Sequence, residues 1–201
     1  MVTAGLSGEG AVLTENGYRF IKKFYIVMII FTAVGAAAGA VYYINLGSAQ
    51  DNINNYVGMF RDTAQNGIDG RAIMLGALKE YLIVAAVFTL SSLIRPGVLF
   101  IPAAAARYGF IYGFTNAALI SSMQQKGLYI ALIRLPVIFF ALSGIYLLGA
   151  VSAVFSVSRE EKKIKFFIFI LIISCTIFCV AAIWDGFLTT TFMKMMSKWL
   201  T

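Results

Sequence analysis

Four ionisable side chains stand within long apolar stretches of this 201-residue chain: Glu80, Arg107, Arg134 and Asp185. Wherever such stretches lie in a bilayer, a charge at its centre costs about 2.5–3.5 kcal/mol even on lenient insertion scales, so these residues usually face the bundle interior and pair. Arg107 is the deepest of the four, because apolar residues flank it on both sides. The sequence predicts a buried ion pair of Arg107 with Glu80 or Asp185.

Two other roles stay open for Arg107. Its guanidinium could reach the nearer membrane interface along its aliphatic stem, or it could line a path for an ion or substrate. Glu80 and Asp185 are two carboxylates on separate segments, as an aspartyl-protease pair would require. Their neighbours, Lys79 and Tyr81 in one case and Trp184 and Gly186 in the other, supply nothing further for that chemistry.

Other catalytic and metal-binding sets are missing from the sequence. The chain has no histidine, which excludes Ser–His and Cys–His nucleophiles and HExxH zinc sites. Its two cysteines, Cys175 and Cys179, lie one helical turn apart and are too few for a metal site. No phosphate-binding glycine motif occurs. We expect a protein that is not an enzyme and that holds no cofactor or metal.

The elements that must position these residues are membrane-spanning helices. Phe24 to Gln50, Leu135 to Ser158 and Phe166 to Trp184 contain no charged residue, and a helix needs about 20 apolar residues to cross a bilayer. Hydrophobic residues make up 60% of the chain, too many for a soluble fold of this size to bury. The sequence predicts an all-α, polytopic membrane bundle in contact with lipid.

The apolar pattern predicts five transmembrane spans in one membrane domain, residues 24–201, after a cytoplasmic tail over residues 1–23. The expected spans are 24–44, 72–94, 98–123, 128–157 and 166–188. A sixth span is the alternative, if residues 98–106 form a re-entrant or short hairpin segment. A net charge of +7 fits positive loops that orient a membrane protein, and no basic stripe with exposed aromatics indicates nucleic-acid binding.

We expect the protein to lie in the cell membrane, and the positions of its basic residues favour a cytoplasmic N-terminus. Arg19, Lys22, Lys23, Arg95 and the loop at 159–165 would then lie inside, and residues 45–70 outside. In the outer segment a 3, 4 and 7 spacing predicts a short amphipathic helix. Its apolar residues are Ile53, Tyr56, Val57 and Phe60. They could dock a partner or pack on the bundle itself.

Two GxxxG patterns predict close helix packing: Gly35 with Gly39, and Gly109 with Gly113. Small residues four apart let a second helix backbone approach closely, which favours association in lipid. Packing within one chain and self-association into a homo-oligomer are both consistent with this pattern.

A series of short motifs runs in a fixed order from Leu78 onward. The motifs are Leu78–Leu82, Ile94–Val98, Arg107–Thr115, Lys126–Leu128, Leu135-Pro136, Gly149–Ser156, Trp184-Asp185 and Met193-Lys194. In this order they resemble the stage II sporulation protein M family. Arg107 is similar to the family's basic residue before Gly-x-x-x-Gly-Phe-Thr, and Asp185 to its acidic residue in the last span. The chain departs at Val137-Ile138, where the family carries polar Gln-Asn.

The resemblance implies a non-enzymatic membrane scaffold of the engulfment machinery in an endospore-forming bacterium. Such a scaffold would hold peptidoglycan-degrading partners, the stage II sporulation proteins D and P, at the septal membrane. The alternative from the residues themselves is a transporter or permease subunit, because Arg107, Glu80 and proline-interrupted helices resemble the midplane sites of transporters.

Overall fold

The computed structural model describes residues 15–46, 69–94, 96–123, 125–157 and 161–192, and within these ranges the chain is helical, without strands. The helices are α1 (Glu15–Ile44), α3 (Gly70–Leu93), α4 (Gly97–Met123), α5 (Gln125–Val157) and α6 (Glu161–Ile183), which continues into a π-helix, η1 (Trp184–Thr189). Five helical stretches are long and apolar enough to span a membrane. The chain is a multi-pass membrane protein with the all-α bundle that the sequence predicts.

The helix bounds bear on two parts of the predicted organisation, the N-terminal tail and the segment 98–106. α1 begins at Glu15, so residues 15–23 extend the first helix instead of forming a separate tail. Residues 98–106 are part of α4, which continues through Pro102 to Met123 without interruption. Proline removes one backbone hydrogen bond, a loss that membrane helices tolerate when neighbouring helices cover the site. In the described ranges there are thus five spans, and the sixth-span alternative is not realised at 98–106.

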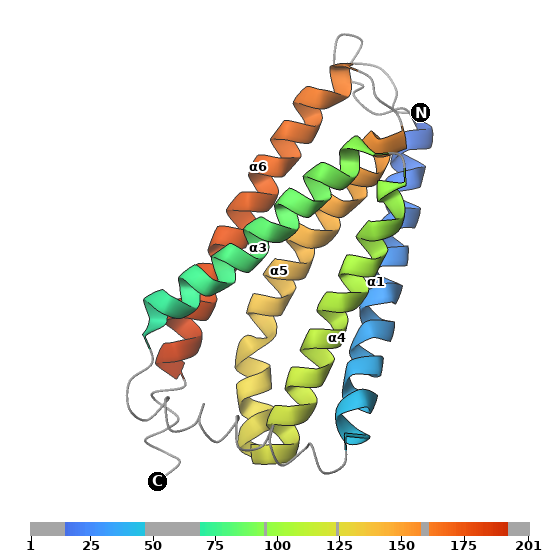
Figure 1. Cartoon of the computed structure of the whole chain (residues 1–201). Helices are drawn as coiled ribbons and strands as arrows, with labels where there is room; N and C mark the ends of the chain where they lie inside the picture. Colours follow the sequence, from blue (N-terminus) through green and yellow to red (C-terminus); the bar gives the residue numbers. More distant parts are fainter. Residues whose placement is uncertain (1–14, 47–68, 95, 124, 158–160, 193–201) are drawn as a thin grey trace, which may run out of the picture.

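α5 is the central helix of the bundle. It packs against α1, α3, α4, α6 and η1, and Figure 1 shows it between α3 and α6 on one side and α4 and α1 on the other. In its most apolar window 67% of the residues are buried, against 22–33% in the other spans. The other four helices therefore present most of their surface outward, as helices in contact with lipid do.

Large side chains from every helix meet around α5. The fully buried ones are Met28 of α1, Phe88 of α3, Ile101 of α4, Ile145 and Leu148 of α5, and Phe178 of α6. In lipid the exclusion of water adds little, so close packing and dispersion hold such helices together. The core consequently defines which face each helix turns inward.

The four glycines of the GxxxG patterns meet in a single contact between α1 and α4. A Cβ added at any of them would overlap a backbone carbonyl of the facing helix: Ala106 for Gly35, Phe110 for Gly39, Thr32 for Gly109 and Ala36 for Gly113. The Thr32 hydroxyl, which also donates to Met28 O at 2.9 Å, lies 3.4 Å from the Ala105 carbonyl oxygen across the same contact. The two small-residue faces are occupied by each other, within one chain.

The helix ends form two groups. The start of α1, the α3–α4 connection and the end of α5 with the start of α6 lie at one end of the bundle, and the end of α1, the start of α3 and the α4–α5 connection lie at the other (Figure 1). At the second end Asp69 caps α3, where its Oδ1 accepts a hydrogen bond from Arg71 N at 2.9 Å. We call the two ends the first and the second end.

Candidate functional site

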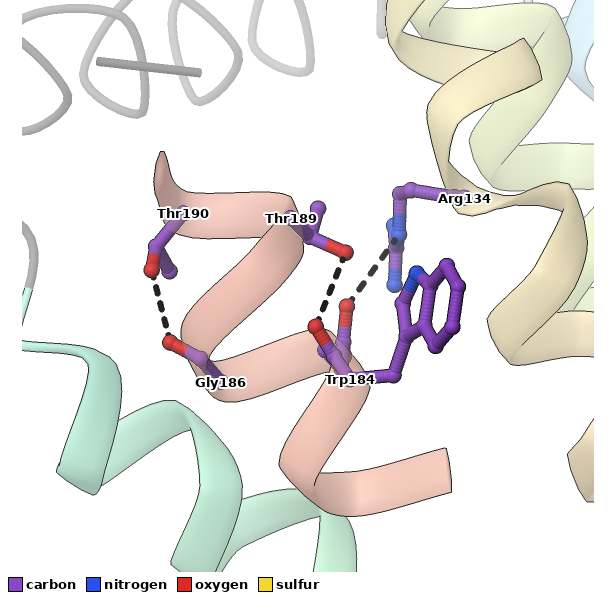
Figure 2. Close-up of polar contacts among 6 residues, drawn as sticks. Arg134, Trp184, Gly186, Thr189 and Thr190 are labelled. Atoms are coloured by element: carbon purple, nitrogen blue, oxygen red, sulfur yellow. Dashed lines mark hydrogen bonds and ion pairs between the residues drawn. The ribbon is translucent and has the colours of Figure 1, made fainter. Parts of the chain in front are cut away.

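An ion pair inside the bundle joins α5 to the π-helix. Arg134 Nε lies 3.9 Å from Asp185 Oδ1, and the two side chains are 29% and 13% exposed (Figure 2). At ~1.5 Å per residue, Arg134 lies about 10 Å from Gly127, where the fourth span begins, and Asp185 about 10 Å from Phe192, where the fifth ends. Both charges thus stand at a similar depth from the second end, where pairing offsets the cost of burial.

The π-helix shapes the side of the site that carries Asp185. Thr189 Oγ1 lies 3.5 Å from the Trp184 carbonyl oxygen, to which it donates, and Thr190 Oγ1 donates to the Gly186 carbonyl at 2.6 Å (Figure 2). Gly186 itself touches the α3 backbone at Gly70. A π turn carries one more residue than an α turn and often occurs at functional sites. Here it allows Gly186 to contact α3 while Asp185 meets α5.

Tyrosine side chains from α3 and α4 complete the site. Tyr81 and Tyr112 share a side-chain hydrogen bond, and both interact electrostatically with Arg134, while Tyr81 also does so with Asp185. The Tyr81 ring stacks on Phe178 of α6, with centroids 5.3 Å apart. Arg134, Asp185, Tyr81 and Tyr112 form what we call the polar cluster, which draws on α3, α4, α5 and η1.

Tyr108 lies beside this cluster with an unsatisfied hydroxyl. It is 7% exposed, its ring centroid is 6.3 Å from that of Tyr112, and its hydroxyl has no hydrogen-bond partner within the described part of the chain. A buried hydroxyl without a partner costs free energy. Among the described tyrosines, Tyr108 is therefore the one with a buried hydroxyl that lacks a hydrogen-bond partner.

The structure corrects the predicted partner of Asp185. That partner is Arg134 and not Arg107, because Arg107 projects from the outward stripe of α4 while Tyr108 and Gly109 beside it turn inward. Glu80 is also exposed, and neither Glu80 nor Arg107 forms an ion pair with any described residue. Of the three residues predicted to form the ion pair, only Asp185 lies inside the bundle, and it does so with Arg134.

Similar depth in the membrane is the property that matches Arg134 with Asp185. In the observed spans Arg134 follows the start of the fourth by as many residues as Asp185 precedes the end of the fifth, and these two helix ends lie at the same end of the bundle. The roles of Tyr81, Tyr108 and Tyr112 had no such signal, because tyrosine is common both in lipid-facing belts and in cores.

The predicted docking residues lie outside the described residues. These are Ile53, Tyr56, Val57 and Phe60, and their assignment stays a prediction from sequence spacing. The cysteines are described: Cys175 is half-buried, Cys179 is exposed, and both are free thiols.

The polar cluster is neutral overall and its charges satisfy each other, so its direct effect is to hold α5, η1, α3 and α4 together. Comparison of the chain with protein-family models, with curated proteins and with solved structures gives no match.

Proposed function

We propose that this protein is a non-enzymatic membrane scaffold of the engulfment machinery, which positions peptidoglycan-degrading partners at the septal membrane. The observation that carries the proposal is where the family-like residues lie. Gly109 and Gly113 form the α1–α4 contact, Asp185 forms the ion pair with Arg134, and Gly97 lies against the Ser91 carbonyl at the α3–α4 turn. Residues that build the bundle itself are what a scaffold needs to keep fixed.

The proposed orientation places the first end of the bundle in the cytoplasm of the cell. The basic residues Arg19, Lys22, Lys23 and Lys165 belong to helix starts at that end, and cytoplasmic loops carry the excess of Lys and Arg. The segment 45–70 then faces the side where peptidoglycan lies. By resemblance, the partners that it would dock are the stage II sporulation proteins D and P.

The test is recovery of those partners from sporulating membranes after crosslinking. Replacing Tyr56 and Phe60 by Ser should leave membrane insertion unchanged, yet release the cell-wall hydrolases and block engulfment. Tyr129→Ser is the matched control, since Tyr129 is an exposed aromatic at the second end of the bundle and should leave recovery unchanged. Equal hydrolase recovery from the double variant and the control would show that Tyr56 and Phe60 do not dock the hydrolases.

A transporter subunit is the second candidate, and the polar cluster favours it. A charge pair at membrane depth beside a non-α turn is typical of substrate and ion paths. Asp185→Asn would then abolish solute uptake into reconstituted vesicles while leaving hydrolase binding unaffected. Solute uptake by a chain that captures no cell-wall enzyme would replace the scaffold proposal with this one.

A further inference from the structure

Three charged side chains lie on the outer surface of the bundle near mid-span: Lys79 and Glu80 of α3 and Arg107 of α4. At ~1.5 Å per residue, Glu80 lies about 15 Å along α3 from Gly70, and Arg107 about 15 Å along α4 from Gly97. A bilayer core is about 30 Å thick. These charges are therefore near the middle of the membrane, on the face that a single copy turns toward lipid.

Their surroundings are apolar and offer no partner. Ile83, one turn from Glu80, is 50% exposed, and Ile111, one turn from Arg107, is 42% exposed. Within the described ranges none of the three charges forms an ion pair or a side-chain hydrogen bond. Glu80 lies on the exposed side of α3 and Arg107 on the exposed side of α4, and these two helices contact each other. We call this surface, with Glu80, Arg107, Ile83 and Ile111, the α3–α4 charged face.

The three charges differ in how a membrane can accommodate them. Long Lys and Arg side chains can carry their charge toward an interface along an apolar stem. Side chains on a helix lean toward its N-terminus, so Lys79 leans toward the second end. Glu80 has a short side chain and no such route. A carboxylate at this depth needs an opposite charge close by.

We propose that the α3–α4 charged face is the interface of a homodimer, in which Glu80 of each copy pairs with Arg107 of the other. A two-fold axis along the membrane normal keeps every residue at its depth and brings α3 of one copy against α4 of its partner. An interface of this kind is self-complementary, because the contact of residue i with residue j occurs twice. Glu80 and Arg107 have opposite charges and lie on neighbouring helices, as that symmetry requires.

The α3–α4 charged face is a better candidate for a dimer interface than the GxxxG faces are. The GxxxG faces of α1 and α4 are filled by each other within one chain, which leaves no small-residue surface there for a partner. The proposal concerns assembly alone, and it stands whether the protein is a scaffold or a transporter.

The first test is disulfide crosslinking in native membranes between two differently tagged copies without Cys175 and Cys179. Ile83→Cys in one copy and Ile111→Cys in the other should form a mixed-tag dimer on oxidation. Val34→Cys paired with Val180→Cys is the matched control, since both side chains are exposed but belong to α1 and α6, which do not form the charged face. A control yield equal to the Ile83–Ile111 yield would overturn the proposal.

The second test separates charge pairing from chance contact. Glu80→Gln or Arg107→Gln should weaken dimerisation about tenfold, because each change removes two intramembrane polar contacts of modest strength per dimer. The exchange Glu80→Arg with Arg107→Glu should restore it. Thermal unfolding of each variant monomer should match the unaltered chain, which excludes misfolding as the cause. Dimerisation that is unaffected by the single changes, or a different membrane protein crosslinked at Ile83 in place of a second copy, would overturn the homodimer.

Discussion

Arg134 and Asp185 compensate each other at a depth where neither would be stable alone. Their distance of 3.9 Å is that of an ion pair, and the half-buried guanidinium keeps some access to its surroundings. Removing one partner of a buried pair is costly mainly because the other charge stays behind. Within the polar cluster, each of these two charges thus offsets the cost of burying the other.

We expect Asp185→Ala to lower the free energy of unfolding by on the order of 2–3 kcal/mol, less than for a fully buried pair because Arg134 is partly exposed. The measurement is thermal unfolding of the purified protein in detergent. Arg107→Gln is the control, because Arg107 has no described intramolecular partner, and it should leave the melting temperature of the monomer unchanged. If the two variants melt alike, the Arg134–Asp185 pair does not stabilise the bundle.

The two tyrosines of α4 should respond oppositely to loss of their hydroxyls. Tyr112→Phe removes the hydrogen bond with Tyr81 and should cost about 1 kcal/mol, whereas Tyr108→Phe removes an unsatisfied buried hydroxyl and should be neutral or stabilising. Chemical denaturation of both variants under one condition gives the comparison. A larger loss for Tyr108→Phe would mean that its hydroxyl has a ligand or solvent partner in the membrane.

At the scale of the helices, α1 is attached by backbone-to-backbone contact with α4. Four glycines permit that approach, and their facing partners are carbonyl groups that cannot move aside as a flexible side chain would. Aromatic rings extend the contact toward the second end, where Tyr43 of α1 meets Phe114 of α4 edge-on at 5.6 Å. Shape, and not charge, fixes this pair of helices.

Gly109→Ala should therefore separate α1 from α4 and lower stability by about 1–3 kcal/mol through overpacking. Gly76→Ala is the matched control, because a Cβ at this exposed α3 position meets nothing within 4 Å. There the exchange should raise stability by about 0.5–1 kcal/mol, since alanine favours helix over glycine. Thermal unfolding of the two variants gives the comparison. Equal shifts of the melting temperature in the same direction would contradict a close contact at Gly109.

Sequence reasoning correctly predicted where the membrane spans lie along the chain. It was wrong about which side chains of a helix face inward, because that depends on how the helix is rotated about its axis. Long apolar runs, three of them free of charge, defined the spans, because length and apolarity can be read along the sequence alone. The partner of Asp185 and the π turn at Trp184–Thr189 depend on which face each helix presents, and lipid-facing and inward-facing positions are similarly apolar. Arg107 was misplaced for that reason: its flanking residues indicated depth but not direction.

For the described part of the molecule, five spans around a central α5 place the start of α1 and the end of η1 at opposite ends of the bundle. α1 starts at the first end and η1 finishes at the second (Figure 1). An odd number of crossings has this outcome whichever side the first end faces, so the orientation depends on the distribution of positive charge.

We expect Ser158, between α5 and α6, to lie in the cytoplasm and Asn54 to lie outside. With Cys175 and Cys179 replaced, Asn54→Cys should react with a membrane-impermeant thiol reagent in intact cells, and Ser158→Cys should react only after the cells are opened. The reverse pattern would invert the orientation, and with it the proposal that residues 45–70 meet peptidoglycan.

The α1–α4 contact also has a consequence for the order of synthesis. Gly35 and Gly39 are made before Gly109 and Gly113, and at about 5–20 residues per second this gap lasts roughly 4–15 s. Throughout that time the flat face of α1 has only lipid, or a chaperone of the insertion machinery, to cover it. Because the glycine face of α1 is covered by α4, the third described helix, α1 can complete its packing only after α4 has been synthesised.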